Sequence, residues 1–297
     1  MSLISPPTLP PLHGGAGVPD GLLNSHWYLE PTVGLGVLGA AVAYLLWVGP
    51  LNQRRPGAAE RPVTGGQIAC FLGGCVTILI ALGPPLDDWS DYYLLSAHMV
   101  QHLLLILVAP PLLLLGLPAW VLRPLLHWRL VARTGYLLTR VVPAFGISAA
   151  VMIVWHVQPF YDAALGNAQI HILEHQLFLA SALLAWWPIV GPLPEWPRLS
   201  PPLQCLYLFL QTFPGGVVGS IITLAEPGLY EHYRNAPRWV MSLATDQEVA
   251  GLLMWVGGFT IYLLLVSIIF FRWAAQEEAK EERRPATVRP RSATTRS

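Results

Sequence analysis

Two pairs of histidines, each with its members four residues apart, have the spacing of a metal site. His98 and His102 stand at the head of one long apolar run, and His171 and His175 stand at the head of another. Residues four apart lie on one face of an α-helix, with Cβ atoms about 5–6 Å apart. Two such imidazoles can share an ion, because neutral imidazole binds copper, zinc, iron and nickel alike. The sequence therefore predicts a shared metal or haem site, provided that the fold brings the two pairs together.

Further candidate groups stand near the ends of the same and neighbouring apolar runs. His156 ends a run of its own and is predicted to be a fifth ligand. Carboxylates can accept hydrogen bonds from imidazole N–H groups and so orient a ligating ring. Thioether sulfurs favour cuprous copper, although Met99 faces about 100° away from its neighbour His98 on a helix of 3.6 residues per turn. The accessory candidates are Glu174, Asp246, Met99, Met254 and His26.

Two other chemistries fit parts of this pattern. The segment His171-Ile172-Leu173-Glu174-His175 matches the H-x-x-E-H motif of inverted zinc peptidases. In that interpretation His171 and His175 bind zinc and Glu174 is the general base, which leaves the other histidine pair without a role. A haem-binding membrane cytochrome would instead use one histidine of each pair as an axial ligand. On the residues alone, both alternatives stay open.

The elements that must position these histidines are membrane-spanning helices. Of the 297 residues, 54% are hydrophobic and only 11% are charged, whereas a soluble domain carries about 25% charge. Three cysteines make no disulfide framework. Since a span needs about 20 mostly apolar residues, the predicted fold class is all-α and polytopic. Seven transmembrane helices are expected, at about 33–49, 67–83, 94–115, 141–157, 171–190, 203–224 and 250–271.

The spans divide the chain into three parts. Residues 1–32 form an N-terminal segment, 33–272 the seven-helix transmembrane domain, and 273–297 a charged, Arg-rich tail. In the sixth span, Pro214-Gly215-Gly216 should kink or break the helix near mid-membrane, because proline lacks the N–H that continues the hydrogen-bond ladder.

The distribution of cations predicts the orientation of the spans. Fifteen of the 17 Lys and Arg residues fall on one side of the seven-span arrangement, and only Arg234 and Arg238 fall on the other. Cytoplasmic loops carry the excess of cations. The N-terminal segment is therefore expected to be extracytoplasmic and the tail cytoplasmic. All five candidate histidine ligands then lie at the outer side.

Several motifs, taken in order, resemble the bacterial cytochrome c oxidase assembly factor CtaG family, the multi-span type linked to caa-type oxidases. The resemblance covers about residues 25–272. The outer loop Glu226–Val240 and the tail depart from it. The matching pieces are His98-Met99-Val100-Gln101-His102, Ala109-Pro110-Pro111-Leu112-Leu113 with Gly116 and Pro118, Trp155-His156 with Pro159 and Tyr161, His171 and His175, and Asp246-Gln247 leading into Gly251-Leu252-Leu253-Met254-Trp255.

The resemblance implies a multi-pass protein of the bacterial inner (plasma) membrane that helps to mature a haem–copper oxidase. Its expected partners are the catalytic subunit of that oxidase and the lipid bilayer, with no nucleic acid. Copper, held at the outer histidine cluster for delivery, is the expected metal, with zinc or haem as alternatives. The expected role is that of an assembly factor and not of an enzyme. Since such a factor needs no general base, Glu174→Gln is expected to retain most assembly activity.

Overall fold

The computed structural model describes residues 29–54, 62–238 and 240–283. This part of the chain is helical apart from short connections and contains no strand, so the predicted all-α fold is confirmed. The three cysteines are free thiols. The helices are α1 (Pro31–Val48), α2 (Pro50–Gln53), α3 (Gly65–Ala81), α4 (Leu86–Tyr92), α5 (Leu95–Leu103), α6 (Ala109–Gly116), α7 (Ala119–Leu122), α8 (Arg129–Leu138), α9 (Val141–His156), α10 (Gln158–Gly166), α11 (Ala168–Val190), α12 (Pro201–Leu224), α13 (Glu231–Arg234), α14 (Leu243–Leu252) and α15 (Gly258–Glu282).

Among the residues that the structure describes, six helical segments are long and apolar enough to cross a membrane, and a bent pair makes a seventh if it is counted as one span. The pair consists of α8 and α9, which meet at 75°. The predicted fourth span, 141–157, corresponds to α9, which has 16 residues and is short of the usual length of about 20. The six segments are Pro31–Gln53, Gly65–Tyr92, Leu95–Gly116, Ala168–Val190, Pro201–Leu224 and Leu243–Glu282.

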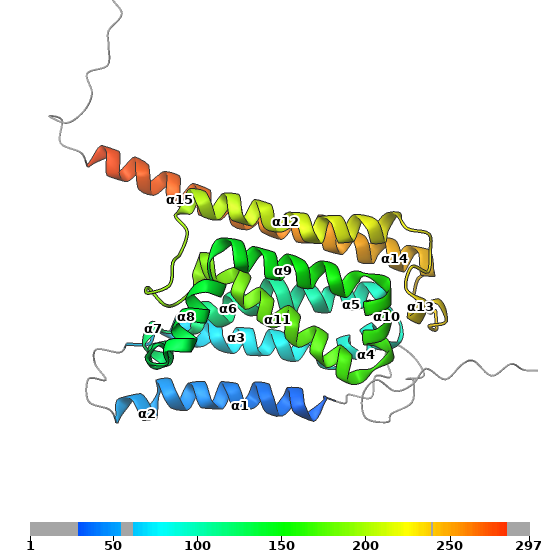
Figure 1. The fold of residues 1–297 in the computed structure, drawn as a ribbon, viewed down its shortest axis with the longest axis horizontal. Helices are drawn as coiled ribbons and strands as arrows, with labels where there is room; N and C mark the ends of the chain where they lie inside the picture. The colour runs from blue at the N-terminus through cyan, green and yellow to red at the C-terminus, as the bar shows by residue number, and fades with distance from the viewer. Residues whose placement is uncertain (1–28, 55–61, 239, 284–297) are drawn as a thin grey trace, which may run out of the picture.

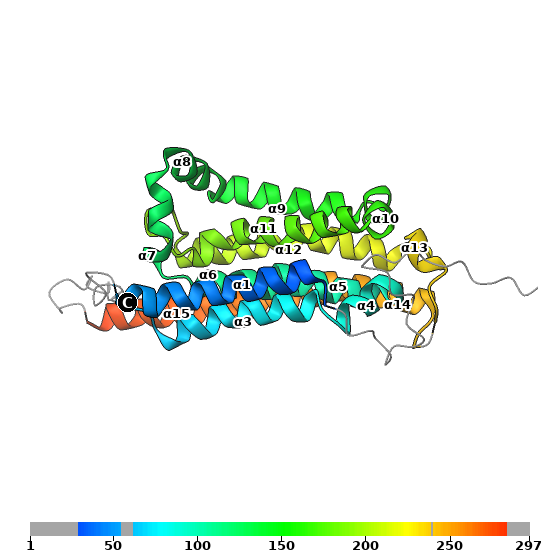
Figure 2. The same ribbon diagram turned by 90° about the horizontal axis from the view of Figure 1, so that it is seen from below.

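The long helices lie side by side as a bundle with different short helices at its two ends. Figure 1 shows α4, α10 and α13 gathered at one end, with α2, α7 and α8 at the other. Figure 2 shows α8 standing away from the bundle. Helices α5 and α11 begin at the α4–α10–α13 end and α9 ends there (Figure 1), so all five candidate histidines are placed at that end.

The third span changes its helical geometry just after His102. A π-helical turn occupies Leu104–Val108 and separates α5 from α6. Pro110 lacks an N–H, so the carbonyl of Ile106 lacks the usual donor four residues along. The indole N–H of Trp186 on α11 donates to that carbonyl instead, at 2.8 Å. This hydrogen bond ties the two histidine-bearing spans together one turn beyond His102.

Of the kink or break expected at Pro214-Gly215-Gly216, the break does not occur. Helix α12 runs without interruption from Pro201 to Leu224 (Figure 1). Membrane helices tolerate internal proline and glycine where neighbouring helices support them. Here α12 packs closely against α14, because a Cβ on Gly219 would lie only 2.8 Å from the carbonyl oxygen of Gly251. Small residues allow this close approach, and it holds α12 along a continuous course.

Candidate metal centre

The two histidine pairs meet in the core of the bundle. The ring centroids within each pair are 4.3 Å apart. Between the pairs, His98 lies 5.4 Å from His171, and His102 lies 5.6 Å from His175. The ring of His156 lies 5.4 Å from that of His102. The predicted convergence is confirmed, while the role of these rings as metal ligands stays a prediction.

Each histidine pair owes its position to a capped helix start. The side chain of Asn167 accepts hydrogen bonds from Gln169 N and Ile170 N and so begins α11 one turn before its first histidine. Helix α5 has no cap from its own N-cap side chain. Its first amides are bound by a carboxylate from α14, which fixes the start of the helix that carries the other pair.

That carboxylate is Asp246, which was expected to accept from an imidazole. Its oxygens instead accept from Leu95 N at 2.9 Å, Ser96 N at 3.0 Å and Ser96 Oγ at 2.6 Å. Arg238 lies 3.4 Å away and balances its charge. The expected contact of Asp246 with an imidazole is therefore wrong. Asp246 instead caps α5, the helix that carries His98 and His102.

Four buried side chains present ligand atoms to a common point. One nitrogen or oxygen from each of His98, His102, Glu174 and His175 lies within 4.8 Å of all the others. Two imidazole nitrogens bound to one tetrahedral ion at 2.0–2.1 Å would be about 3.3 Å apart. The Nε2 atoms of His98 and His102 are 2.8 Å apart. A shared ion would therefore require only a small movement of these rings.

Glu174 lies among the imidazoles rather than behind them. It is fully buried, with Oε1 3.7 Å from His102 Nε2 and Oε2 3.9 Å from His171 Nε2. Neither oxygen has a hydrogen-bond partner among the described residues. A buried carboxylate without donors is costly, and a bound cation would compensate it. The sequence offered Glu174 as a supporting group or, in the zinc-peptidase interpretation, as a general base, and its position among the imidazoles also allows it to be a ligand.

The hydrogen bonds of His98 and His156 determine which ring nitrogen each of these residues directs toward the cluster. Burial raises the pKa of Tyr233 well above its usual value, so its hydroxyl stays protonated and donates to Ser90 O at 2.6 Å. The same oxygen lies 3.3 Å from His98 Nδ1 and must accept there, which assigns the proton to Nδ1. His156 likewise donates from Nδ1 to Met152 O at 2.7 Å. Both rings therefore keep the Nε2 lone pair for a metal, as ligating histidines do.

The remaining accessory candidates lie outside this group. Met99 and Met254 are buried in one apolar cluster with Ile222 and Tyr161, where they pack as core residues. His26 lies outside the described residues.

Sequence reasoning missed Asp91, which it left in an outer loop. The structure places Asp91 on α4, 1% exposed, with Oδ1 3.9 Å from His171 Nδ1. The Nε2 of His232 donates to the Asp91 carbonyl at 2.7 Å. Asp91 precedes His98 by two helical turns, but α4 ends at Tyr92. Helical spacing could not have found it, because the contact depends on the break between α4 and α5.

Comparison with known proteins identifies the family to which this arrangement belongs. The family of cytochrome c oxidase caa3 assembly factors (Caa3_CtaG) matches residues 42–276. The chain belongs to this family. The match begins within α1, extends into α15 and includes all five histidines as well as Asp91 and Glu174.

Three sequence relatives of this family member are mycobacterial proteins, each described as uncharacterized. Proteins of Mycobacterium bovis and Mycobacterium tuberculosis are each 23% identical over 269 residues, and one of Mycobacterium leprae is 24% identical over 270. Each alignment covers 84% of this chain but 40% of the relative, so the chain spans less than half the length of these proteins. No solved structure matches the chain.

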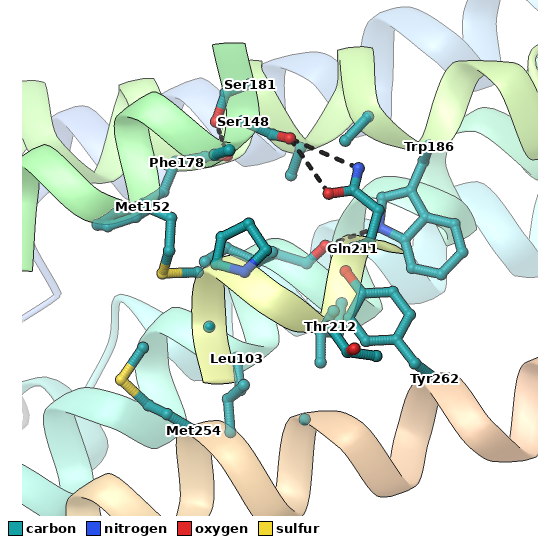
Figure 3. Close-up of a pocket in the computed structure, with 18 of the residues that line it drawn as sticks. Leu103, Ser148, Met152, Phe178, Ser181, Trp186, Gln211, Thr212, Met254 and Tyr262 are labelled. Carbon is teal, nitrogen blue, oxygen red and sulfur yellow. Dashed lines mark hydrogen bonds between the residues drawn. The ribbon is translucent and has the colours of Figure 1, made fainter. Parts of the chain in front are cut away.

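In this Caa3_CtaG protein, an aromatic ring closes the cluster toward the middle of the bundle. The ring of Phe178 lies 4.4 Å from His102 and 5.8 Å from His156, centroid to centroid. On its other side Phe178 lines a cavity of about 50 Å³, together with Ser148 and Gln211, whose side chains are hydrogen-bonded (Figure 3). Such a volume holds a few water molecules. Phe178 therefore separates the imidazoles from this internal space.

A groove reaches the cluster from the side of the bundle. It has a volume of about 230 Å³ and lies between α1, α3 and α11. His175 lines it and is 8% exposed, whereas His98, His102 and His171 are fully buried. Two acidic residues, Glu30 and Asp87, line the same groove. A cation can therefore approach the cluster along a path with negative charge.

Proposed function

We propose that the protein binds copper at this centre and delivers it to the catalytic subunit of a haem–copper oxidase in a bacterial inner membrane. The observation that carries the proposal is the set of four buried ligand atoms, from His98, His102, Glu174 and His175, within 4.8 Å of one another. The chain belongs to a family of cytochrome c oxidase assembly factors. A metal centre in such a protein fits the maturation of an enzyme that itself requires copper.

The donor atoms favour a divalent transition-metal ion. They are imidazole nitrogens and carboxylate oxygens, while the sulfurs of Met99 and Met254 belong to the apolar core. Cuprous ions prefer soft sulfur ligands, and among divalent ions copper binds most tightly to a given site of this kind. The proposed cargo is therefore Cu(II), with zinc as the competing ion.

Close packing of the rings favours an ion over haem. A haem needs a slot for its flat macrocycle between two axial imidazoles. Here the imidazoles, Phe178 and Tyr161 lie against one another at centroid distances between 4.3 and 6.2 Å. Zinc hydrolase chemistry at His171, Glu174 and His175 would leave the second histidine pair without a function, although that pair contributes two of the four ligand atoms.

The distribution of cations supports delivery on the outer side. With 15 of 17 Lys and Arg residues on one side of the spans, the positive-inside rule assigns the opposite end to the exterior. All five histidines lie at that opposite end, beside α4, α10 and α13 (Figure 1). An oxidase subunit in the same membrane could dock there from the side.

Purified protein provides the direct test. Full-length protein loaded with Cu(II) should retain copper after desalting and should show no Soret band. His102→Ala and His175→Ala should each abolish copper binding at this four-ligand position and so lower the copper retained per chain. His127→Ala is the matched control, because His127 is exposed and lies between α7 and α8 at the other end of the bundle. Wild-type protein that holds haem, or that retains no copper, would contradict the proposal.

A cellular experiment tests the role in assembly. Deletion of the gene should lower active haem–copper oxidase without lowering transcripts of the oxidase genes. Excess copper in the medium should partly restore activity, because mass action can replace a delivery protein. Normal oxidase activity in the deletion strain under limiting copper would refute the proposed role in oxidase assembly.

A further inference from the structure

A second set of ligand atoms lies directly beside the first. One ligand atom from each of Asp91, His98 and His171 lies within 4.8 Å of the other two, and all three side chains are buried. His98 belongs to both sets, so the two candidate positions adjoin each other. This second set includes Asp91, which the proposed copper site does not use.

Glu174 connects the two sets through its two oxygens. Oε1 faces His102 Nε2 at 3.7 Å, in the first set, and Oε2 faces His171 Nε2 at 3.9 Å, in the second. His171 in turn has its other nitrogen, Nδ1, 3.9 Å from Asp91 Oδ1. Glu174 thus contacts histidines of both sets, and Glu174 and Asp91 face opposite nitrogens of the His171 ring.

Asp91 is held in place by neighbours on two elements. The hydroxyl of Ser90 donates to Asp91 Oδ1 at 3.2 Å, and His232 Nε2 donates to the Asp91 carbonyl at 2.7 Å. Tyr233, next to His232, donates to the Ser90 carbonyl at 2.6 Å. Helix α4 is thus tied to α13, with the Asp91 carboxylate beside His171.

From this geometry we propose that the centre binds two transition-metal ions. One lies at His102, Glu174 and His175, and the other at Asp91 and His171, with His98 within reach of both. The inference rests on the proposed function, because it assumes that the first position binds copper. It adds that each chain carries two ions and that Asp91 is a ligand of the second.

Charge balance supports two ions over one. Asp91 and Glu174 bring two carboxylates into a buried site in a membrane-spanning bundle, where uncompensated charge is costly. Neutral imidazoles contribute no charge, and Arg238 is engaged by Asp246. One ion at the first position lies close to Glu174, whose oxygens face His102 and His171. A second cation between Asp91 and His171 places a positive charge beside each carboxylate.

The copper content of the wild-type protein tests the inference. Full-length protein in detergent is loaded with Cu(II), desalted, and measured by elemental analysis and by electron paramagnetic resonance. Two coppers per chain are expected, with a spin count below the copper content because adjacent Cu(II) ions couple magnetically. One copper per chain with a full spin count would overturn the second position and leave the proposed function intact. No retained copper would overturn both.

Variants assign the second position to Asp91. Asp91→Asn should bind one copper and give an uncoupled spectrum. His171→Gln should behave in the same way, and it provides the test if Asp91→Asn fails to fold. Asp162→Asn is the matched control, because this acid lies at the same end of the bundle and its Oδ1 accepts from Glu231 N, outside both sets. A coupled pair of coppers in a folded Asp91→Asn or His171→Gln protein would overturn the assignment.

Discussion

Tyr233 determines which nitrogen of His98 faces the cluster. Its hydroxyl proton goes to Ser90 O, so its oxygen is left to accept from His98 Nδ1. A ligating histidine that loses such a partner can rotate or change tautomer, and metal affinity falls by about 10–100-fold when these groups are removed. The residue lies far from His98 in the chain, and only the fold reveals its role.

Tyr233→Phe should therefore weaken Cu(II) binding by about 10–100-fold while the protein stays folded. Competition titration with a chelator of known affinity measures the change. Tyr230→Phe provides the control, since its hydroxyl donates to the His156 carbonyl oxygen and not to an imidazole nitrogen. Equal affinities for Tyr233→Phe and wild type would show that Nδ1 of His98 needs no acceptor.

Glu174→Gln should lower copper retention at least 10-fold, because an amide loses the charge that compensates the ion. This expectation reverses the one from sequence, where Glu174 seemed dispensable to an assembly factor. The Glu231→Gln variant, an exposed acid at the same end of the bundle, should keep wild-type retention. A Glu174→Gln protein that retains copper fully yet loses all oxidase-assembly activity would favour the hydrolase alternative.

The spacing of the histidines could be predicted from sequence because it depends only on helical periodicity. The i,i+4 spacing correctly placed each pair on one helix face, and the length of the apolar runs located the spans. The places of Asp91, Tyr233 and Glu174 beside the imidazoles depend on tertiary contacts between α4, α5, α11 and α13, which no local pattern encodes. No helix break occurs at Pro214, because packing of α12 on α14 outweighs the local propensity.

At the scale of elements, α14 holds the start of α5. Asp246 on α14 accepts three hydrogen bonds from Leu95 and Ser96, so the first turn of the helix that carries His98 depends on a side chain about 150 residues later in the chain. Removing the carboxylate leaves buried donors unsatisfied, at a cost of about 1–3 kcal/mol each. The cap thereby couples the stability of the bundle to the geometry of the cluster.

Asp246→Ala should lower the melting temperature by several degrees and weaken copper retention together. Thermal unfolding in detergent and elemental analysis of the same preparation measure both effects. Glu248→Ala, two residues away on α14, is the control, because Glu248 is exposed. A wild-type melting temperature for Asp246→Ala would show that the start of α5 does not depend on this cap.

At the scale of the whole molecule, the distribution of charge predicts the orientation of the bundle in the membrane. Positive residues gather at the α2–α7–α8 end and in the last helix, while the histidine cluster lies at the opposite end (Figure 1). Loops rich in Lys and Arg stay in the cytoplasm. This arrangement predicts that the histidine cluster lies at the outer side of the membrane.

Cysteine labelling in intact cells checks that orientation. After the three native cysteines are replaced by serine, Asp88→Cys on α4 should react with a membrane-impermeant maleimide. Arg133→Cys on α8 should react only after the cells are opened. The reverse pattern would place the cluster on the cytoplasmic side and would rule out delivery from outside.

Phe178 has a kinetic consequence for copper transfer. That ring closes one side of the cluster, and His175 alone of the two pairs lines the side groove. Under the proposed function, we therefore expect copper to load and unload through this groove. A donor and a recipient cannot occupy one opening together, so transfer should proceed by a ping-pong scheme in which the donor departs before the oxidase docks. Double-reciprocal plots of transfer rate against recipient concentration, at several donor concentrations, should then give parallel lines.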